Sequence, residues 1–154
     1  MIVRTYFAAK DAAGARALLD TMPSQFGLTP DTNLVNTVLD GYAERRDMEG
    51  AMALANEMQH KFNAPPSIYT INILLKGFKK TGDLESAQSI LQMMRQAGKL
   101  KPDVVTLSTM VALYAQRDEL DRAVEFVRAF RREYGVKPNP LTVSPLLRAL
   151  KKRW

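Results

Sequence analysis

A period of 36 residues runs through the chain. Prolines recur at this interval, and three other positions keep the same spacing with identical or similar residue types. A fixed period of about 20 to 50 residues is typical of solenoids, in which each repeat buries its apolar face against the next. The recurring positions are Pro30, Pro66, Pro102 and Pro138; Ala15, Ala51, Ala87 and Ala123; Met22, Met58, Met94 and Phe130; and Tyr6, Tyr42, Phe78 and Tyr114.

The composition limits the chemistry that is available. The 154 residues include no cysteine and a single histidine, His60, which excludes disulfides, thiolate metal sites, cysteine nucleophiles and histidine metal clusters. The sequence also lacks nucleophile motifs, metal-ligand spacings and glycine-rich phosphate loops. We therefore expect a protein that is not an enzyme and has no cofactor, metal or small-molecule substrate.

The charge and the N-terminus bear on partners and location. A formal net charge of +6 indicates an acidic partner. No apolar run is long enough to span a bilayer, so we expect no membrane insertion. Residues 1–10 show neither a signal-peptide pattern nor the arginine and serine content of a transit peptide. Three alternatives stay open: a targeting segment has been removed, the protein needs none, or the chain is a segment of a longer protein.

Each period contains two helical patterns separated by a turn. In the unit that begins at Asp31, apolar spacing predicts helices over residues 32–45 and 48–61, with Asp47 as the N-cap of the second. The following prolines end the unit. We expect one all-α domain over residues 1–154, divided into a half repeat at 1–30, full repeats at 31–67, 68–103 and 104–139, and a half repeat at 140–154.

The residues in these units resemble a known family. The string Ile68-Tyr-Thr-Ile-Asn-Ile-Leu-Leu-Lys-Gly-Phe-Lys-Lys-Thr-Gly-Asp-Leu-Glu-Ser-Ala is similar to a pentatricopeptide repeat, as are the later Met93-Met94 and Lys101-Pro102-Asp103. The other units match through Asn36, Gly41, Tyr42, Ala51 and Met58, and through Val104, Val105, Thr106, Tyr114, Ala123 and Pro138-Asn139. The resemblance covers almost the whole chain. It implies an α-solenoid of stacked antiparallel helix-turn-helix repeats in a right-handed superhelix.

The resemblance also implies binding of single-stranded RNA, with one base per repeat. A polar base-edge residue, one turn into the first helix, contacts the edge of the base. A partner residue at the end of the repeat cooperates with it, and a packing residue, second in the repeat, lies against the face of the base. The base-edge residues are Asn36, Asn72 and Ser108, their partner residues are Ser67, Asp103 and Asn139, and the packing residues are Asn33, Tyr69 and Val105.

The pairing tendencies of the family assign a base to each pair. In chain order, the three pairs resemble readers of cytosine, uracil and adenine. When the chain, from its N-terminus, is aligned with RNA in the 5′ to 3′ direction, the implied RNA sequence is C-U-A. Ser144 would belong to a further half-site for which no partner residue follows.

The same residue types also fit roles within the fold. An asparagine at position 72, beside Ile71 and Ile73, favours a polar face that meets a ligand, because a buried amide without partners is costly. A side-chain bond to the backbone of a neighbouring repeat would also satisfy it. The partner residues precede first helices, where serine, aspartate and asparagine are favoured N-caps without any RNA.

Basic residues divide into two groups. Lysines on the first helices are candidate phosphate contacts. Arginines near the end of a second helix are expected to be solvated and favourably placed at a helix C-terminus. The phosphate-contact candidates are Lys76, Lys79, Lys80, Lys151 and Lys152, with Arg148 and Arg153 beside the last two, and the solvated arginines are Arg128, Arg131 and Arg132. The methionine register is expected to fill the core, and His60 to lie at the surface.

Two functions fit these observations. The resemblance implies a mitochondrial or chloroplast RNA-binding protein that acts in RNA processing, stability or translation. The short array and the polar packing residue Asn33 favour instead a protein-interaction scaffold, or a small subunit of a large organellar complex. Stacking contributes about 1–3 kcal/mol per base, and a three-base sequence recurs about every 64 nucleotides by chance. RNA recognition is therefore expected to need a longer array, a dimer or a partner.

Overall fold

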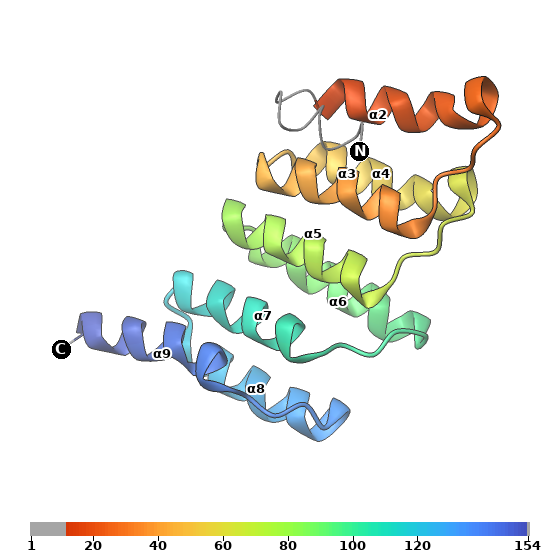
Figure 1. Ribbon diagram of the computed structural model, residues 1–154. Coiled ribbons are helices and arrows are strands. Elements are labelled where there is room, and N and C mark those ends of the chain that lie inside the picture. Colours follow the sequence, from red (N-terminus) through yellow and green to blue (C-terminus); the bar gives the residue numbers. More distant parts are fainter. Residues whose placement is uncertain (1–11, 154) are drawn as a thin grey trace. The chain divides into compact units, whose positions relative to one another are not determined.

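The structure is a computed structural model that describes residues 12–153 (Figure 1). The predicted start of the first half repeat, which includes Tyr6, lies outside the described residues. No described residue belongs to a β-strand, and the all-α prediction is confirmed. The helices are α2 (Ala12–Thr21), the π-helical turn η1 (Met22–Phe26), α3 (Thr32–Glu44), α4 (Met48–Phe62), α5 (Ile68–Thr81), α6 (Leu84–Ala97), α7 (Val104–Gln116), α8 (Leu120–Tyr134) and α9 (Pro140–Arg153).

The described chain falls into two compact units that divide between Gly77 and Phe78, within α5. In the first unit, α3 packs against both α2 and α4. In the second unit, α7 packs against α6, α8 and α9. Over the described range, none of the helices is both long enough and apolar enough to cross a membrane.

Side-chain caps start α3 and α4, and the cap of α4 is the aspartate that the sequence predicts. Asp31 accepts a hydrogen bond from the Leu34 N–H at 2.8 Å and caps α3. Asp47 accepts a hydrogen bond from the Gly50 N–H at 3.0 Å and caps α4. Both helices predicted for the repeat at residues 31–67 are confirmed, with ends within one residue of the expected positions.

The second unit uses the same devices. Asp103 and Thr106 form a capping box at the start of α7, in which the Thr106 N–H donates to Asp103 Oδ1 at 3.0 Å and the Asp103 N–H donates to Thr106 Oγ1 at 3.2 Å. Gly82 has a φ of 73° and forms the turn before α6, which Asp83 then caps. Glycine suits this left-handed conformation because it has no Cβ atom.

The periodic positions form the core of each unit. All four residues of the alanine register have no exposed area, which lets neighbouring helices approach closely. Met58, Met94 and Phe130 are buried as predicted, whereas Met22 is half-buried at the start of η1. His60 is exposed, as expected.

The close approach of α3 and α4 generates a prediction at Gly50. A Cβ atom at this position would lie 2.7 Å from Cε1 and 2.9 Å from Cδ1 of the buried Tyr42 ring. Overpacking costs about 1–3 kcal/mol, which exceeds the gain of up to about 1 kcal/mol in helix propensity. We therefore expect Gly50→Ala to lower the free energy of unfolding by about 1–2 kcal/mol, measured by urea denaturation.

Ala53→Gly is the matched control, because Ala53 lies exposed on the same helix. It should cost about 1 kcal/mol through propensity alone. A Gly50→Ala variant more stable than the wild type would contradict the tight contact with Tyr42.

Candidate nucleic-acid interface

The predicted base-edge residues lie on the first helices, but they are not equally accessible. Asn72 on α5 and Ser108 on α7 are half-buried. Asn36 on α3 is only 2% exposed, which departs from the expected exposed polar face. It forms a hydrogen bond with a residue of α5 that was not among the predicted site residues.

That residue is Thr70, which has no exposed area. Its hydroxyl donates a hydrogen bond of 2.7 Å to Asn36 Oδ1. The same hydroxyl oxygen accepts the backbone N–H of Ser67 at 3.0 Å, and the Thr70 N–H donates to Ser67 Oγ at 3.3 Å. Thr70 therefore joins the predicted base-edge residue Asn36 to its predicted partner residue Ser67.

The second unit repeats this arrangement around Thr142, which is also fully buried. The hydroxyl oxygens of Thr142 and Ser108 lie 2.7 Å apart. Thr142 Oγ1 lies 3.0 Å from Asn139 Oδ1 and accepts the Asn139 N–H at 3.2 Å. Ser108 and Asn139, another predicted base-edge and partner pair, are thus joined through one threonine hydroxyl.

The partner residues also act at helix ends, as their residue types predict. Asn139 Oδ1 accepts the Thr142 N–H at 3.0 Å beside the start of α9. Ser67 does the same for Thr70 beside α5, and Asp103 caps α7. Capping therefore accounts for the residue types at these three positions, and it leaves their predicted role with RNA as a separate question.

The amide nitrogen of Asn36 has no hydrogen-bond partner among the described residues. A buried donor without a partner costs about 1–3 kcal/mol. The other side of the amide is satisfied by Thr70. An acceptor that reached Nδ2 would relieve this cost, although the side chains that cover the atom would first have to move.

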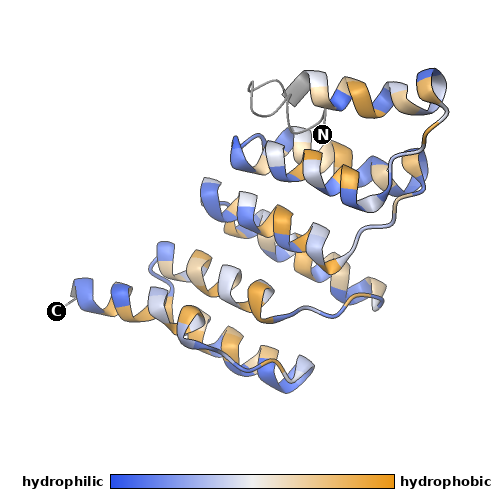
Figure 2. Ribbon diagram, viewed as in Figure 1, coloured by the Kyte–Doolittle hydropathy of each residue, from blue (hydrophilic) through white to orange (hydrophobic). Residues whose placement is uncertain are grey.

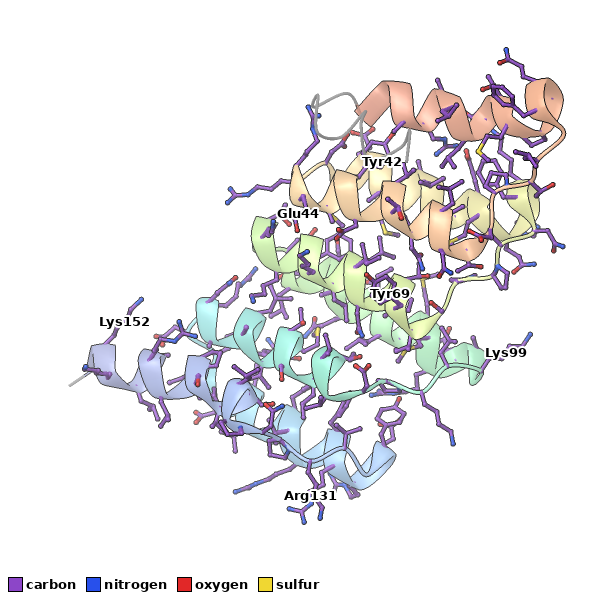
Figure 3. All side chains as sticks on the ribbon, viewed as in Figure 1. Tyr42, Glu44, Tyr69, Lys99, Arg131 and Lys152 are labelled. Carbon is purple, nitrogen blue, oxygen red and sulfur yellow. The ribbon has the colours of Figure 1, made fainter. Side chains whose placement is uncertain are left out.

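The packing residues are displayed at the surface. Tyr69 is 63% exposed at the start of α5, where Figure 3 labels it, and Val105 is 52% exposed at the start of α7. Asn33 is also exposed. Leu141, which the sequence analysis did not name, occupies the same register one period after Val105 and is 76% exposed. Exposed side chains of this size are the type on which RNA bases stack or pack.

One predicted phosphate contact is already engaged in the first unit. Lys76 Nζ lies 3.3 Å from Asp40 Oδ1 and also pairs with Glu44. The hydrogen bond to Glu44 raises the pKa of the Lys76 ammonium above its ordinary value. Two carboxylates therefore balance the charge of Lys76, and the sequence could not indicate this because both acids come from α3.

Other predicted phosphate contacts gather in the second unit. A cleft of about 620 Å³ between α7 and α9 is lined by Lys79, Arg148 and Lys152, together with the carboxylate of Asp118. In the part of the chain that the structure describes, none of these three cations forms an ion pair. The end of α9 is strongly hydrophilic in Figure 2, and Figure 3 shows Lys152 there. The cleft is thus a positively charged surface.

The remaining basic residues have simpler surroundings. Lys80 is half-buried, and Lys151 is exposed. The arginines of α8 are exposed, as expected for solvated side chains, and Figure 3 shows Arg131 among them. The side chain of Arg153 lies outside the described part of the chain.

The sequence contained a signal for the bridging threonines. Thr70, Thr106 and Thr142 recur at the 36-residue period. Leu34 takes the same position in the first full repeat. A polar residue that keeps step with a core register indicates an internal hydrogen bond. Leu141 could have been found in the same way, by continuing the register of Val105.

Comparison with family models identifies the repeats. A model described as the PPR repeat family matches residues 30–80 and 66–116, and a model described as a PPR repeat matches residues 105–133. Together these matches cover more than half of the chain. No curated protein sequence matches the chain significantly.

Solved structures share the fold. The pentatricopeptide repeat protein PPR10 from maize is 24% identical with a TM-score of 0.82, over 98% of this chain and 21% of that one. PPR10 in complex with an 18-nucleotide psaJ RNA element is also 24% identical, with a TM-score of 0.81 over 99% and 22%. The PPR domain of Arabidopsis thaliana protein-only RNase P 1 in complex with tRNA is 16% identical, with a TM-score of 0.73 over 98% and 78%. The chain therefore has the α-solenoid fold, and it spans about a fifth of the length of the maize protein.

The capping box at α7 can be tested separately from any ligand. Asp103→Ala should lower the free energy of unfolding by about 1 kcal/mol, because loss of an N-cap costs about 0.5–2 kcal/mol. Asp103→Asn keeps an oxygen acceptor for the Thr106 N–H and should retain most of the stability. Thermal unfolding followed by circular dichroism measures both, and equal losses in the two variants would contradict the capping role.

Proposed function

Because the chain belongs to the pentatricopeptide repeat family, we propose that it is an RNA-binding repeat protein that takes single-stranded RNA along its first helices. The main support is the pair of polar residues joined by a buried threonine, which occurs in both units. Each pair lies in a repeat whose packing residue is exposed. A base needs both features, because its edge forms hydrogen bonds and its face stacks or packs.

In the second unit, one base would lie with its edge toward Ser108 and Asn139. The exposed side chains of Val105 and Leu141 are available to its two faces. The family resemblance assigns adenine to this pair. The proposal is one of binding, and no catalytic step is assigned to any residue.

In the first unit, Asn36 and Ser67 would contact the base edge, with Tyr69 available for stacking. Stacking on an aromatic side chain contributes about 1–3 kcal/mol per base. Asn33 offers no comparable surface to the opposite face. This site is therefore expected to bind its base less tightly than a site with an apolar side chain on each face of the base.

The neighbours in the family support RNA as the ligand class. PPR10 was solved with an RNA element, and the PPR domain of protein-only RNase P 1 was solved with tRNA. By the same resemblance, we extend the proposal to a mitochondrial or chloroplast protein that acts in RNA processing, stability or translation. Since this chain offers few repeats, tight and selective binding would need a longer array or a partner.

A second function, protein interaction, is favoured by one observation on α9. Its exposed apolar residues, Val143, Leu147 and Leu150, follow helical spacing, and Leu147 is 63% exposed. A stripe of this kind on a helix is suited to packing against another helix. Under this alternative, the chain would act as a scaffold or as a small subunit of a large organellar complex.

RNA binding is tested by titrating the chain with short single-stranded RNAs that contain C-U-A, with a scrambled RNA and with the matching DNA, at a stated low salt concentration. NMR titration suits this measurement because binding to three bases is expected to be weak. The proposal predicts tighter binding of the C-U-A RNA than of either control. No detectable binding of any RNA at low salt would contradict it.

Lys76, which is paired with carboxylates, and Lys152, which lines the basic cleft, give a further prediction. For single-stranded nucleic acid, log K falls with log salt concentration with a slope of about −0.7 for each phosphate contact. Lys152→Gln should therefore reduce the steepness of the slope by about 0.7, because Lys152 lines the basic cleft without an ion pair. Lys76→Gln is the matched comparison and should change the slope little, because Asp40 and Glu44 already balance that charge. Equal effects of the two substitutions would contradict the assignment.

A further inference from the structure

We infer that Thr70 and Thr142 are positioning residues that decide whether each base-edge side chain presents a hydrogen-bond donor or an acceptor to RNA. The inference rests on the proposed function and adds specificity-determining residues to it. Neither threonine can touch a ligand in this structure, because both are fully buried. Each acts through Asn36 or Ser108, to which its hydroxyl is bonded at 2.7 Å.

In the first unit, the Thr70 hydroxyl has one hydrogen and two oxygen neighbours, Asn36 Oδ1 at 2.7 Å and Ser67 Oγ at 3.3 Å. The shorter distance is typical of an O–H···O hydrogen bond, and the longer one is not. The hydrogen therefore lies toward Asn36. The carbonyl oxygen of Asn36 is held by Thr70. Its amide nitrogen has no partner among the described residues and is left as a donor, which a base reaches once the side chains that cover it move.

In the second unit, the hydroxyl hydrogens can be assigned in a similar way. Asn139 Oδ1 carries no hydrogen, so its 3.0 Å bond to Thr142 Oγ1 uses the hydrogen of Thr142. The 2.7 Å contact between Thr142 and Ser108 must then use the hydrogen of Ser108. Ser108 consequently presents only lone pairs and acts as an acceptor.

The two sites therefore present opposite polarities. A fixed donor at Asn36 suits bases with a ring carbonyl, which cytosine, uracil and guanine have and adenine lacks. A fixed acceptor at Ser108 suits bases with an exocyclic amino group, which adenine has and uracil lacks. The threonines thus favour cytosine over adenine at the first site, and adenine over uracil at the second.

Replacing either threonine with valine keeps the shape of the side chain and removes the hydroxyl. In Thr70→Val, the Asn36 amide is free to turn and to present its oxygen to the amino group of adenine. In Thr142→Val, the hydrogen of Ser108 is released, and the serine can donate to a carbonyl of uracil. Each variant should lose discrimination at one base and keep it at the other.

The experiment measures dissociation constants by NMR titration of the whole chain, with C-U-A compared with A-U-A and with C-U-U. Thr70→Val should reduce the preference for C-U-A over A-U-A by about fivefold or more, since a net hydrogen bond is worth about that factor. It should leave the preference over C-U-U unchanged. Thr142→Val should show the reverse pattern, so each variant is the control for the other.

Two further variants separate positioning from stability. Thr70→Ser restores the hydroxyl and should restore the preference. Thr109→Val removes a hydroxyl of α7 whose one hydrogen bond among the described residues is to the Val105 carbonyl oxygen, at 2.8 Å, and should leave both preferences intact. If one valine variant does not fold, as judged by circular dichroism, the other decides the matter.

The outcomes are distinguishable. The wild type is first required to bind with both preferences. If the folded valine variants keep both preferences, or if they lose affinity equally for all RNAs, this inference is overturned and RNA binding is not. Wild-type binding without base preference would overturn it as well. No binding of RNA by the wild type would overturn the proposed function, and this inference with it.

Discussion

Burial of the apolar stripe of each helix against its neighbours is the constraint on which the structure depends. The alanine register at zero exposure brings the helix backbones close together, and the larger residues of the aromatic and methionine registers fill the remaining space. A polar side chain near these contacts must therefore find an internal partner or point outward. Thr70 and Thr142 have such partners, and their hydrogen bonds link residues that are 34 positions apart in sequence. The packing of the helices thus sets the hydrogen bonding at the candidate interface.

Much of the fold could be predicted from the sequence because the helix ends are determined locally. Asp31 and Asp47 cap within three residues of their own positions, and the apolar spacing that follows each of them has the helical period. The π-helical turn η1 was not predicted. It includes Pro23, which the sequence would assign to a break rather than to a continued helix.

The candidate interface was less accessible to prediction because its contacts join different helices. Sequence register placed Asn36 and Ser67 correctly on α3 and immediately before α5. The register of Thr70 indicates an internal hydrogen bond, but not that its partners are these two residues or that Asn36 is buried. The same limit applied to Lys76, whose carboxylate partners lie 32 and 36 residues away. Lys79 and Lys152 were chosen as separate residues, and the fold brings them to one cleft. The assignment of individual bases to individual repeats is still a prediction.

The side-chain amide of Asn36 gives the most direct test of the account, because its nitrogen is the buried donor for which a base is the proposed partner. NMR spectra of the isotope-labelled chain would follow the two amide protons of Asn36 as unlabelled single-stranded C-U-A RNA is added. If a base is the partner of this nitrogen, these resonances change progressively and saturate with the RNA. Unchanged Asn36 resonances at RNA concentrations that shift the rest of the spectrum would contradict it.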